Sequence, residues 1–252
     1  MTLSKFTIYQ NLHRFFILGF LSCFILQVGF WFKSEHFKPD VYIVPPLPSK
    51  ESVAALSFGD EQFYFRAAAL KIENAGDSFG RFTSLKKYDY AKLYDWFKLL
   101  DSLDHKSKYV PNLAAVYYAQ TPNKEDNRYI IKYLDEYVGD NIDEDWWWIY
   151  QAFYIAHATL KDDSLALKFA YKLSKNKNEK APTWTRELPA FIESKLGNDC
   201  EAFLVINKML KDNESGEQKI SPAEMDFIRH FIKNGLGDLK KKNFNPNKCA
   251  DR

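Results

Sequence analysis

The sequence has few of the residues that build disulfide-rich, collagen-like or disordered proteins. Its 252 residues include three cysteines, Cys23, Cys200 and Cys249, which are too few for the disulfide framework of a small secreted domain. Ten glycines and ten prolines exclude a collagen-like chain, and a hydrophobic content of 46% excludes wholesale disorder. Because 35 Lys and Arg residues face 33 Asp and Glu, the net charge is only +2, and we expect no nucleic-acid partner.

The sequence also lacks the short motifs of common active sites. It contains no GxSxG, no HExxH, no phosphate-binding GxxxxGK[ST] and no dinucleotide-binding GxGxxG. The histidines at positions 13, 36, 105, 157 and 230 include no i, i+4 pair, so we expect no metal site. The acidic run at 140–145 lacks the glycine and the distal glutamate of a calcium loop, and we interpret it as a helix start. No catalytic residue and no cofactor is therefore predicted.

One long uncharged hydrophobic run lies near the N-terminus. Residues 15–32 read FFILGFLSCFILQVGFWF, which as a helix spans about 27 Å of a hydrocarbon core that is roughly 30 Å thick. Arg14 and Lys33 flank the run, and Trp31 occupies the position of an interfacial aromatic residue. The bulky residues at its end disfavour cleavage of a signal peptide, which needs small residues. We therefore predict an uncleaved transmembrane signal-anchor over 15–32, preceded by a short tail at 1–14.

The flanking charges give little guidance on orientation, because two cations precede the run and two follow it closely. A short N-terminal tail usually stays in the cytoplasm, so we expect residues 33–252 to lie on the other side. The protein would then be a single-pass protein of the bacterial inner membrane with its C-terminal domain in the periplasm. There Cys200 and Cys249 could pair, although a buried thiol and a tail thiol fit the sequence equally well.

The remaining chain divides into three parts by composition. Residues 33–51 contain four prolines and predict a semi-rigid spacer. Residues 52–235 predict a helical-repeat domain, and 236–252 a polar tail in which the lysines at 240–242 are solvated.

Four segments of the helical region share one apolar pattern at a spacing of about 36 residues. In each, small or apolar residues stand at i, i+4 and i+7, on one face of an α-helix. The four triples are Leu93, Phe97 and Leu100; Ile130, Leu134 and Tyr137; Ala166, Ala170 and Leu173; and Ala202, Ile206 and Met209. They predict four helical hairpins, none of which can bury its apolar face alone.

The segments between these helices predict the partner helices of the hairpins. We place the partner helices at 61–74, 111–120, 146–160 and 183–196, with Phe63, Ala67 and Leu70 as the apolar face of the first. A last helix begins at Ser221, where Ser-Pro-Ala-Glu is a capping-box pattern, and ends near Gly235. We expect it to cover the open end of the stack.

These features give the region 60–212 a family resemblance. The second helices begin with Ala166 and Ala202, and Trp148 and Trp184 recur 36 residues apart. In this pattern the region resembles the tetratricopeptide repeat family. The resemblance implies an all-α fold, a right-handed α-solenoid of about four helical hairpins. It also implies that the first helices line a peptide-binding groove, faced by Asn112, Trp148, Gln151, Trp184 and Glu187.

Both tryptophans have an alternative interpretation, since they could simply pack between hairpins, which the burial tendency of Trp favours. Successive side chains on a helix lie about 100° apart, so at least one residue of the Trp146–Trp148 run should be exposed. The connection at 76–87 is long for a hairpin and carries Arg81, a further partner-binding candidate. Alternatively its phenylalanines only cover the first repeat.

From these observations we expect a membrane-tethered helical-repeat module that binds a peptide or an envelope protein. One alternative is a glycan-cleaving envelope enzyme with Glu187 or Glu73 as a single acid, which requires a buried carboxylate with a raised pKa. Another is a structural subunit of a membrane complex, which requires a large exposed apolar patch.

Overall fold

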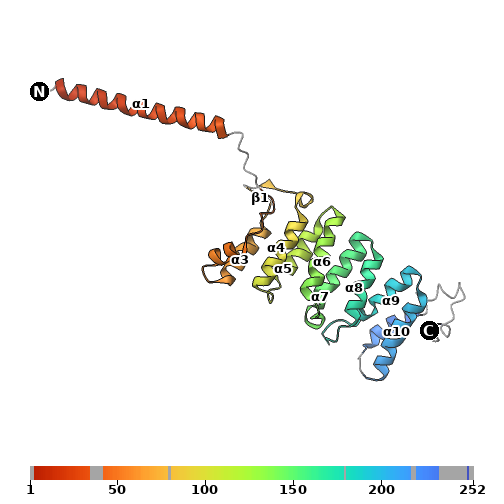
Figure 1. Ribbon diagram of the computed structural model, residues 1–252. Helices are drawn as coiled ribbons and strands as arrows, with labels where there is room; N and C mark the ends of the chain where they lie inside the picture. The colour runs from red at the N-terminus through yellow and green to blue at the C-terminus, as the bar shows by residue number, and fades with distance from the viewer. Residues whose placement is uncertain are drawn as a thin grey trace. The chain divides into compact units, whose positions relative to one another are not determined.

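The computed structural model describes residues 3–34, 42–78, 81–178, 180–216, 220–232 and 249. Over these ranges it contains eleven α-helices, several short 3-10 and π-helical turns and one two-stranded ribbon, so the chain is all-α as predicted (Figure 1). Contacts divide the chain into two units, Met1–Tyr42 and Ile43–Arg252, and each is described by itself. We call the second the helical unit.

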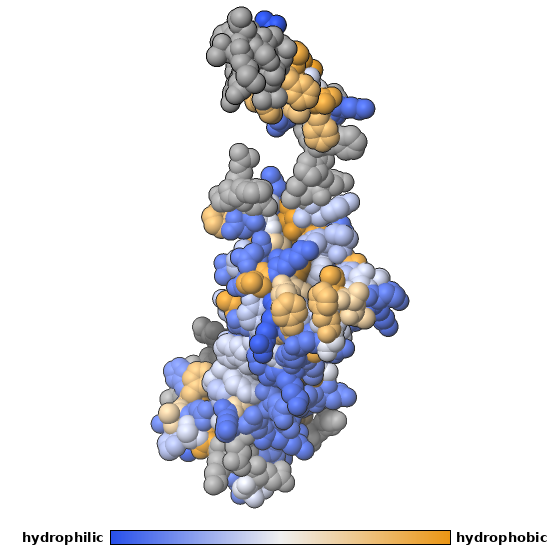
Figure 2. All heavy atoms as spheres, turned by 90° about the vertical axis from the view of Figure 1, so that its left-hand side faces the viewer, coloured by the Kyte–Doolittle hydropathy of each residue, from blue (hydrophilic) through white to orange (hydrophobic). Residues whose placement is uncertain are grey.

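The first unit consists of helix α1, Leu3–Ser34, which contains the predicted hydrophobic run. Its segment Arg14–Lys33 has a mean hydropathy of 2.1, and none of it is buried against the protein. Most of the side chains that Figure 2 colours on α1 are hydrophobic, whereas hydrophilic residues dominate the visible face of the helical unit. A helix whose apolar residues lie all round and are exposed fits a signal anchor or a signal sequence.

The helical unit is a row of helices that pack side by side in chain order (Figure 1). Helix α8 contacts both α7 and α9, and α9 contacts α10. The helices are α2 Lys50–Ser57, α3 Glu61–Glu73, α4 Tyr90–Leu103, α5 Tyr109–Asn112, α6 Asn127–Val138, α7 Ile142–Tyr154, α8 Asp163–Ser174, α9 Trp184–Leu196, α10 Asp199–Glu214 and α11 Pro222–His230. Shorter elements are β1 Asp77–Ser78, β2 Arg81–Phe82, η1 Leu85–Lys87, η2 Leu113–Tyr117, η3 Tyr118–Gln120, η4 Lys124–Asp126 and η5 Ile155–Leu160.

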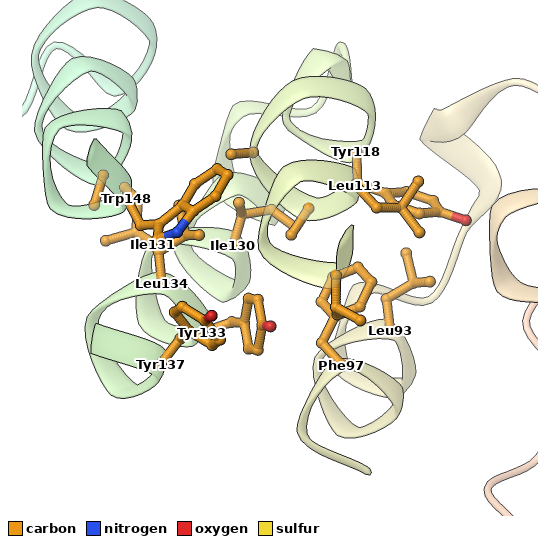
Figure 3. Packing of buried hydrophobic residues seen from close by; sticks show 14 of the residues in the cluster. Leu93, Phe97, Leu113, Tyr118, Ile130, Ile131, Tyr133, Leu134, Tyr137 and Trp148 are labelled. Carbon is orange, nitrogen blue, oxygen red and sulfur yellow. The ribbon is translucent and has the colours of Figure 1, made fainter. Parts of the chain in front are cut away.

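The four equally spaced apolar triples are confirmed as the buried faces of α4, α6, α8 and α10. All twelve residues are buried, and Leu93, Phe97 and Leu134 are fully inaccessible to solvent. Figure 3 shows side chains of α4, α6 and α7 directed toward one another in the shared core. Burying one of the larger side chains among them, a Leu, Ile, Phe or Met, contributes about 1.5–3 kcal/mol, so packing of these faces against neighbouring helices stabilises the row.

The apolar face expected for the first partner helix is wrong. Phe63 and Leu70 of α3 are each 57% exposed, and Tyr64, Phe65 and Ile72 are buried instead. Because α3 carries apolar residues on more than one side, its burial is decided by where its neighbours α2 and α4 lie. A helical period alone cannot choose between two such faces.

The buried residues form two cores. The larger extends from Val44 to Ile192, and the smaller joins Ala190 of α9 and Ala202 of α10 to Ile228 of α11. Beside the smaller core, a disulfide links Cys200 in the first turn of α10 to Cys249. Because disulfides persist in oxidising compartments, this bond hints at an extracytoplasmic domain.

Part of the predicted spacer at 33–51 packs on the helical unit. Val44 is buried, and the Nε1–H of Trp96 donates a hydrogen bond to the carbonyl oxygen of Pro45 at 2.8 Å. Helix α2 then begins at Lys50. Residues 35–41 of the spacer, and the tail at 236–252 apart from Cys249, lie outside the described residues.

Candidate functional site

A pocket of about 360 Å³ opens between α9 and α11, and we call it the aromatic pocket. Positions 184, 187, 188 and 191 lie at helical spacing on one side of α9, and positions 224 and 227 face them from α11. The side chains that shape it are Trp184, Glu187, Leu188, Phe191, Glu224 and Phe227. The wall is mostly apolar, with the two glutamates as its charged groups.

The start of α11 positions one of these glutamates. The predicted capping box is confirmed: Ser221 Oγ accepts the Glu224 N–H at 3.3 Å, and Glu224 Oε2 accepts the Ser221 N–H at 3.0 Å. Pro222 occupies the first turn, where its missing N–H costs no hydrogen bond. The carboxylate of Glu224 is therefore fixed at the rim of the aromatic pocket.

Glu187 is the buried acid of the pocket. It is 1% exposed, and its Oε1 has no hydrogen-bond partner among the described residues. Burial raises the pKa of the Glu187 carboxyl to about 7, and the negative charge of Glu224 contributes to the shift. An ionised carboxylate without a partner is costly to bury, so this group favours protonation or a donor from a ligand.

Aromatic rings continue from the pocket onto α7. The Trp184 ring lies 5.0 Å from that of Tyr150, which in turn lies 5.5 Å from that of Trp147. On the other side, Phe191 meets Phe227 at 5.8 Å. Trp147 is 44% exposed, so the expectation that one residue of the Trp run stays exposed is confirmed. The Trp184–Tyr150 and Phe191–Phe227 pairs are edge to face, a favourable ring geometry that helps to fix the shape of the pocket wall.

The other predicted groove residues lie apart from this pocket. Trp148 is buried and packs with Ile131 and Leu134 of α6, as its alternative interpretation expected (Figure 3). Gln151 is half-buried on α7. The side chain of Arg81 lies outside the described residues; its backbone forms the short ribbon β1–β2, which occupies the long connection at 76–87. Of the predicted residues whose side chains the structure describes, two line the aromatic pocket, Trp184 and Glu187.

Asn112 lines a different pocket of about 360 Å³, together with the second acid candidate, Glu73. The Tyr109 hydroxyl donates a hydrogen bond to the Glu73 carboxylate. Burial, followed by this bond, raises the pKa of Tyr109 to about 12. Glu73 is exposed and already accepts this donor, which makes it a weaker acid candidate than Glu187.

The sequence did not reveal an Asp–His pair at the C-terminal end of α4, formed by Asp101 in the helix and His105 just after it. His105 Nδ1 lies 2.8 Å from Asp101 Oδ1, and the His105 carbonyl oxygen accepts the Tyr137 hydroxyl at 3.1 Å. The i, i+4 spacing was the available signal. The hydroxyl of the neighbouring Ser102 donates a hydrogen bond to the Leu99 carbonyl oxygen at 2.6 Å and not to the pair. We interpret the pair as the polar end of α4.

The acidic run at 140–145 begins α7, as predicted, and its acids make protein contacts. Asp145, 2% exposed, accepts from Lys108 Nζ at 2.5 Å, and Asp143 Oδ1 accepts the Lys177 N–H at 2.7 Å. Across the described ranges, no group of three or more His, Cys, Asp or Glu residues could hold a metal ion.

Comparisons with known proteins found no relative of this chain. No protein-family model, no curated protein and no solved structure matches the chain, so no family is identified for this all-helical protein with its N-terminal apolar helix.

Proposed function

We propose that the protein is a membrane-tethered helical-repeat module that binds a peptide or protein partner through the aromatic pocket. The observation that carries this proposal is the oxygen of Glu187 that has no hydrogen-bond partner among the described residues and lies in a pocket lined mostly by aromatic and aliphatic side chains. A buried acceptor without a donor costs about 1–3 kcal/mol, and a ligand that supplies the donor removes that cost.

The tether and the repeats are parts of the same proposal. In it, α1 crosses the bilayer as a signal-anchor and the helical unit lies outside the cytoplasm, in a bacterium the periplasm; the disulfide between Cys200 and Cys249 supports this location. The helical unit is a right-handed α-solenoid of about four hairpins. The constant spacing of the buried triples and the packing of consecutive helices support this arrangement.

The chemistry of the pocket defines the partner that fits it. Three rings, those of Trp184, Phe191 and Phe227, surround two carboxylates, which suits the cationic head and apolar stem of a Lys or Arg side chain. The carboxylate of Glu187 would accept a charge-assisted hydrogen bond from that head. Tethering to one membrane raises the local concentration of both proteins, so one such contact and a few apolar ones suffice.

Peptide binding by the full chain in detergent tests the proposal. Short apolar peptides that contain one Lys or Arg should bind, and the same peptides with acetylated lysine should bind at least tenfold more weakly. Glu187→Gln should cause a similar loss. Glu201→Gln is the control, because Glu201 lies exposed on α10. Equal binding of charged and acetylated peptides would contradict the proposal.

The same buried acid favours a second candidate, a glycan-cleaving enzyme. A carboxyl with a pKa of about 7 can protonate a leaving group near neutral pH, as a general acid must. The lining argues against the enzyme, because sugar hydroxyls need polar side chains and the described residues of this pocket supply just two, Glu187 and Glu224. Release of soluble fragments from cell-wall glycan by the wild type, abolished by Glu187→Gln, would favour the enzyme over the binding module.

A further inference from the structure

A second and larger pocket, of about 660 Å³, lies where the end of α8 meets α9 and α10. We call it the basic pocket. Among the described residues that line it, four carry cationic side chains and one carries an acid. They are Lys175 and Lys177 just after α8, Arg186 on α9 and Lys208 on α10, and the acid is Asp212. No motif in the sequence marked this group, because its members come from three separate segments.

The cations of the basic pocket differ from the lysines of α8 itself. Lys168 and Lys172 both pair with Asp135, at 2.8 and 2.6 Å, as surface lysines of a packed helix commonly do. Within the described part of the chain, none of the four cations of the basic pocket has an ion-pair partner. Concentrating like charges around a concavity is unfavourable unless an anion compensates them.

Arg186 is held in place beside this pocket. Its Nε–H donates a hydrogen bond to the carbonyl oxygen of Asn176 at 3.0 Å. That bond fixes the plane of the guanidinium and uses only one of its five donors. The terminal nitrogens make no hydrogen bond to any described residue, so they remain able to bind two oxygens of one anion side by side.

Asn176 supplies an independent observation. It lines the basic pocket and is 2% exposed. Its Oδ1 accepts the Asn178 N–H at 2.8 Å, which identifies the other side-chain atom as the Nδ2 donor. That donor has no acceptor among the described residues. Buried amide donors are nearly always paired, so an unpaired one beside four cations points to an anionic acceptor.

We infer that the basic pocket binds a phosphate group, held by Arg186, Lys208 and the lysines that follow α8. A phosphate carries close to two negative charges near neutral pH and three oxygens that accept strong hydrogen bonds, which matches a cluster of four cations better than one carboxylate does. This inference does not rest on the aromatic pocket, which has the opposite charge and lies between α9 and α11. The phosphate could belong to an anionic phospholipid or to a soluble ligand.

Calorimetric titration of the full chain in neutral detergent tests the inference and separates the two sources. One arm uses inorganic phosphate, and the other uses a short-chain phosphatidic acid below its critical micelle concentration. Sodium chloride and sulfate at equal ionic strength serve as salt controls. We expect saturable binding in at least one phosphate arm; preference for the lipid identifies a headgroup, and equal affinity identifies the phosphate alone.

Paired substitutions locate the binding. Lys177→Gln with Lys208→Gln removes two exposed cations of the pocket and should weaken phosphate binding at least tenfold without loss of folding. Lys71→Gln with Lys124→Gln removes the same charge from exposed positions elsewhere and should leave binding unchanged. Equal effects of the two pairs, or binding of chloride as tight as that of phosphate, would overturn the inference.

Discussion

Trp184 and Tyr150 meet edge to face, with ring centroids 5.0 Å apart, although they belong to different helices, α9 and α7. Through this contact, the wall of the aromatic pocket that α9 supplies packs against helix α7. Such a ring pair contributes about 0.5–1.5 kcal/mol to stability, in addition to the contribution of the apolar area that it buries. The pocket is therefore shaped by packing along the row of helices as well as by α9 and α11 themselves.

The raised pKa of Glu187 predicts how stability depends on pH. Because the folded pKa of about 7 exceeds the ordinary value of 4.5, the folded state binds the proton more tightly than the unfolded state. The resulting stabilisation is complete below about pH 4.5 and is lost as the pH rises through 7, and it amounts to about 3 kcal/mol. Glu224 is the charged group that acts on Glu187, since Arg186 on the same helix is bonded toward Asn176.

Urea unfolding at pH 5 and pH 8 checks this prediction. The wild type should lose more free energy of unfolding between the two pH values than Glu187→Gln does. Other groups that titrate in this window contribute equally to both proteins, so the difference isolates Glu187. The same pH dependence in the wild type and the variant would contradict the prediction.

The contact between Lys108 and Asp145 predicts that removing either partner lowers the free energy of unfolding. Asp145 is 2% exposed, and its other contact is the Asn141 side-chain amide at 3.2 Å. Lys108→Met should lower the free energy of unfolding by about 1–2 kcal/mol, less than for a fully buried pair because Lys108 is half-exposed. Lys106→Met, at an exposed neighbouring position, should change it by less than about 0.5 kcal/mol. Thermal unfolding of the two variants checks the prediction. Equal decreases in melting temperature would argue against a stabilising contact between Lys108 and Asp145.

Two glycines provide a matched test of the turn after α3. Gly76 and Gly59 have φ values of +76° and +84°, in the region that side chains other than glycine rarely adopt. A Cβ on Gly76 would collide with the Tyr88 hydroxyl, which donates to the Ala75 carbonyl oxygen, whereas a Cβ on Gly59 would meet nothing within 4 Å. We expect Gly59→Ala to cost about 1 kcal/mol and Gly76→Ala at least 1 kcal/mol more, measured by chemical unfolding.

The disulfide predicts a stability that depends on redox state. Reduction, or Cys249→Ser, should lower the free energy of unfolding by about 2–4 kcal/mol, because the bond closes a loop with a sequence separation of 49 residues. Cys23→Ser is the control, since Cys23 is the free cysteine on α1 and should have no effect on the helical unit. Thiol labelling of protein isolated from its own cells should modify Cys23 alone; labelling of all three would exclude an oxidised native state.

The buried faces were predictable where a helix offers one apolar stripe. Leu93, Phe97 and Leu100 follow the helical period, and no competing apolar residue lies on the opposite side of α4 at comparable spacing. Helix α3 offers two faces, so its buried residues could not be chosen without the positions of α2 and α4. Within the Trp run, one helical step of about 100° separates buried Trp148 from exposed Trp147, and only the location of α6 decides between them.

The sequence predicted only part of the lining of the aromatic pocket. Trp184 and Glu187 belong to one helix and could be named from the resemblance to the tetratricopeptide repeat family. Their partners Glu224 and Phe227 come from α11, about 40 residues later in the chain. The Ser221 capping pattern predicted that α11 would begin there, not that it would lie against α9. The pKa of Glu187 follows from that packing and so could not be read from local sequence.

Photo-crosslinking in the native membrane tests the proposed partner-binding pocket most directly. A photoreactive phenylalanine analogue at position 227, where the natural side chain is 49% exposed at the pocket, should yield one discrete protein adduct on irradiation, and Glu187→Gln should abolish it. The same analogue at position 58, where Phe58 is 87% exposed far along the chain, should yield none. The absence of a protein adduct at position 227, or identical adducts at both positions, would contradict the account.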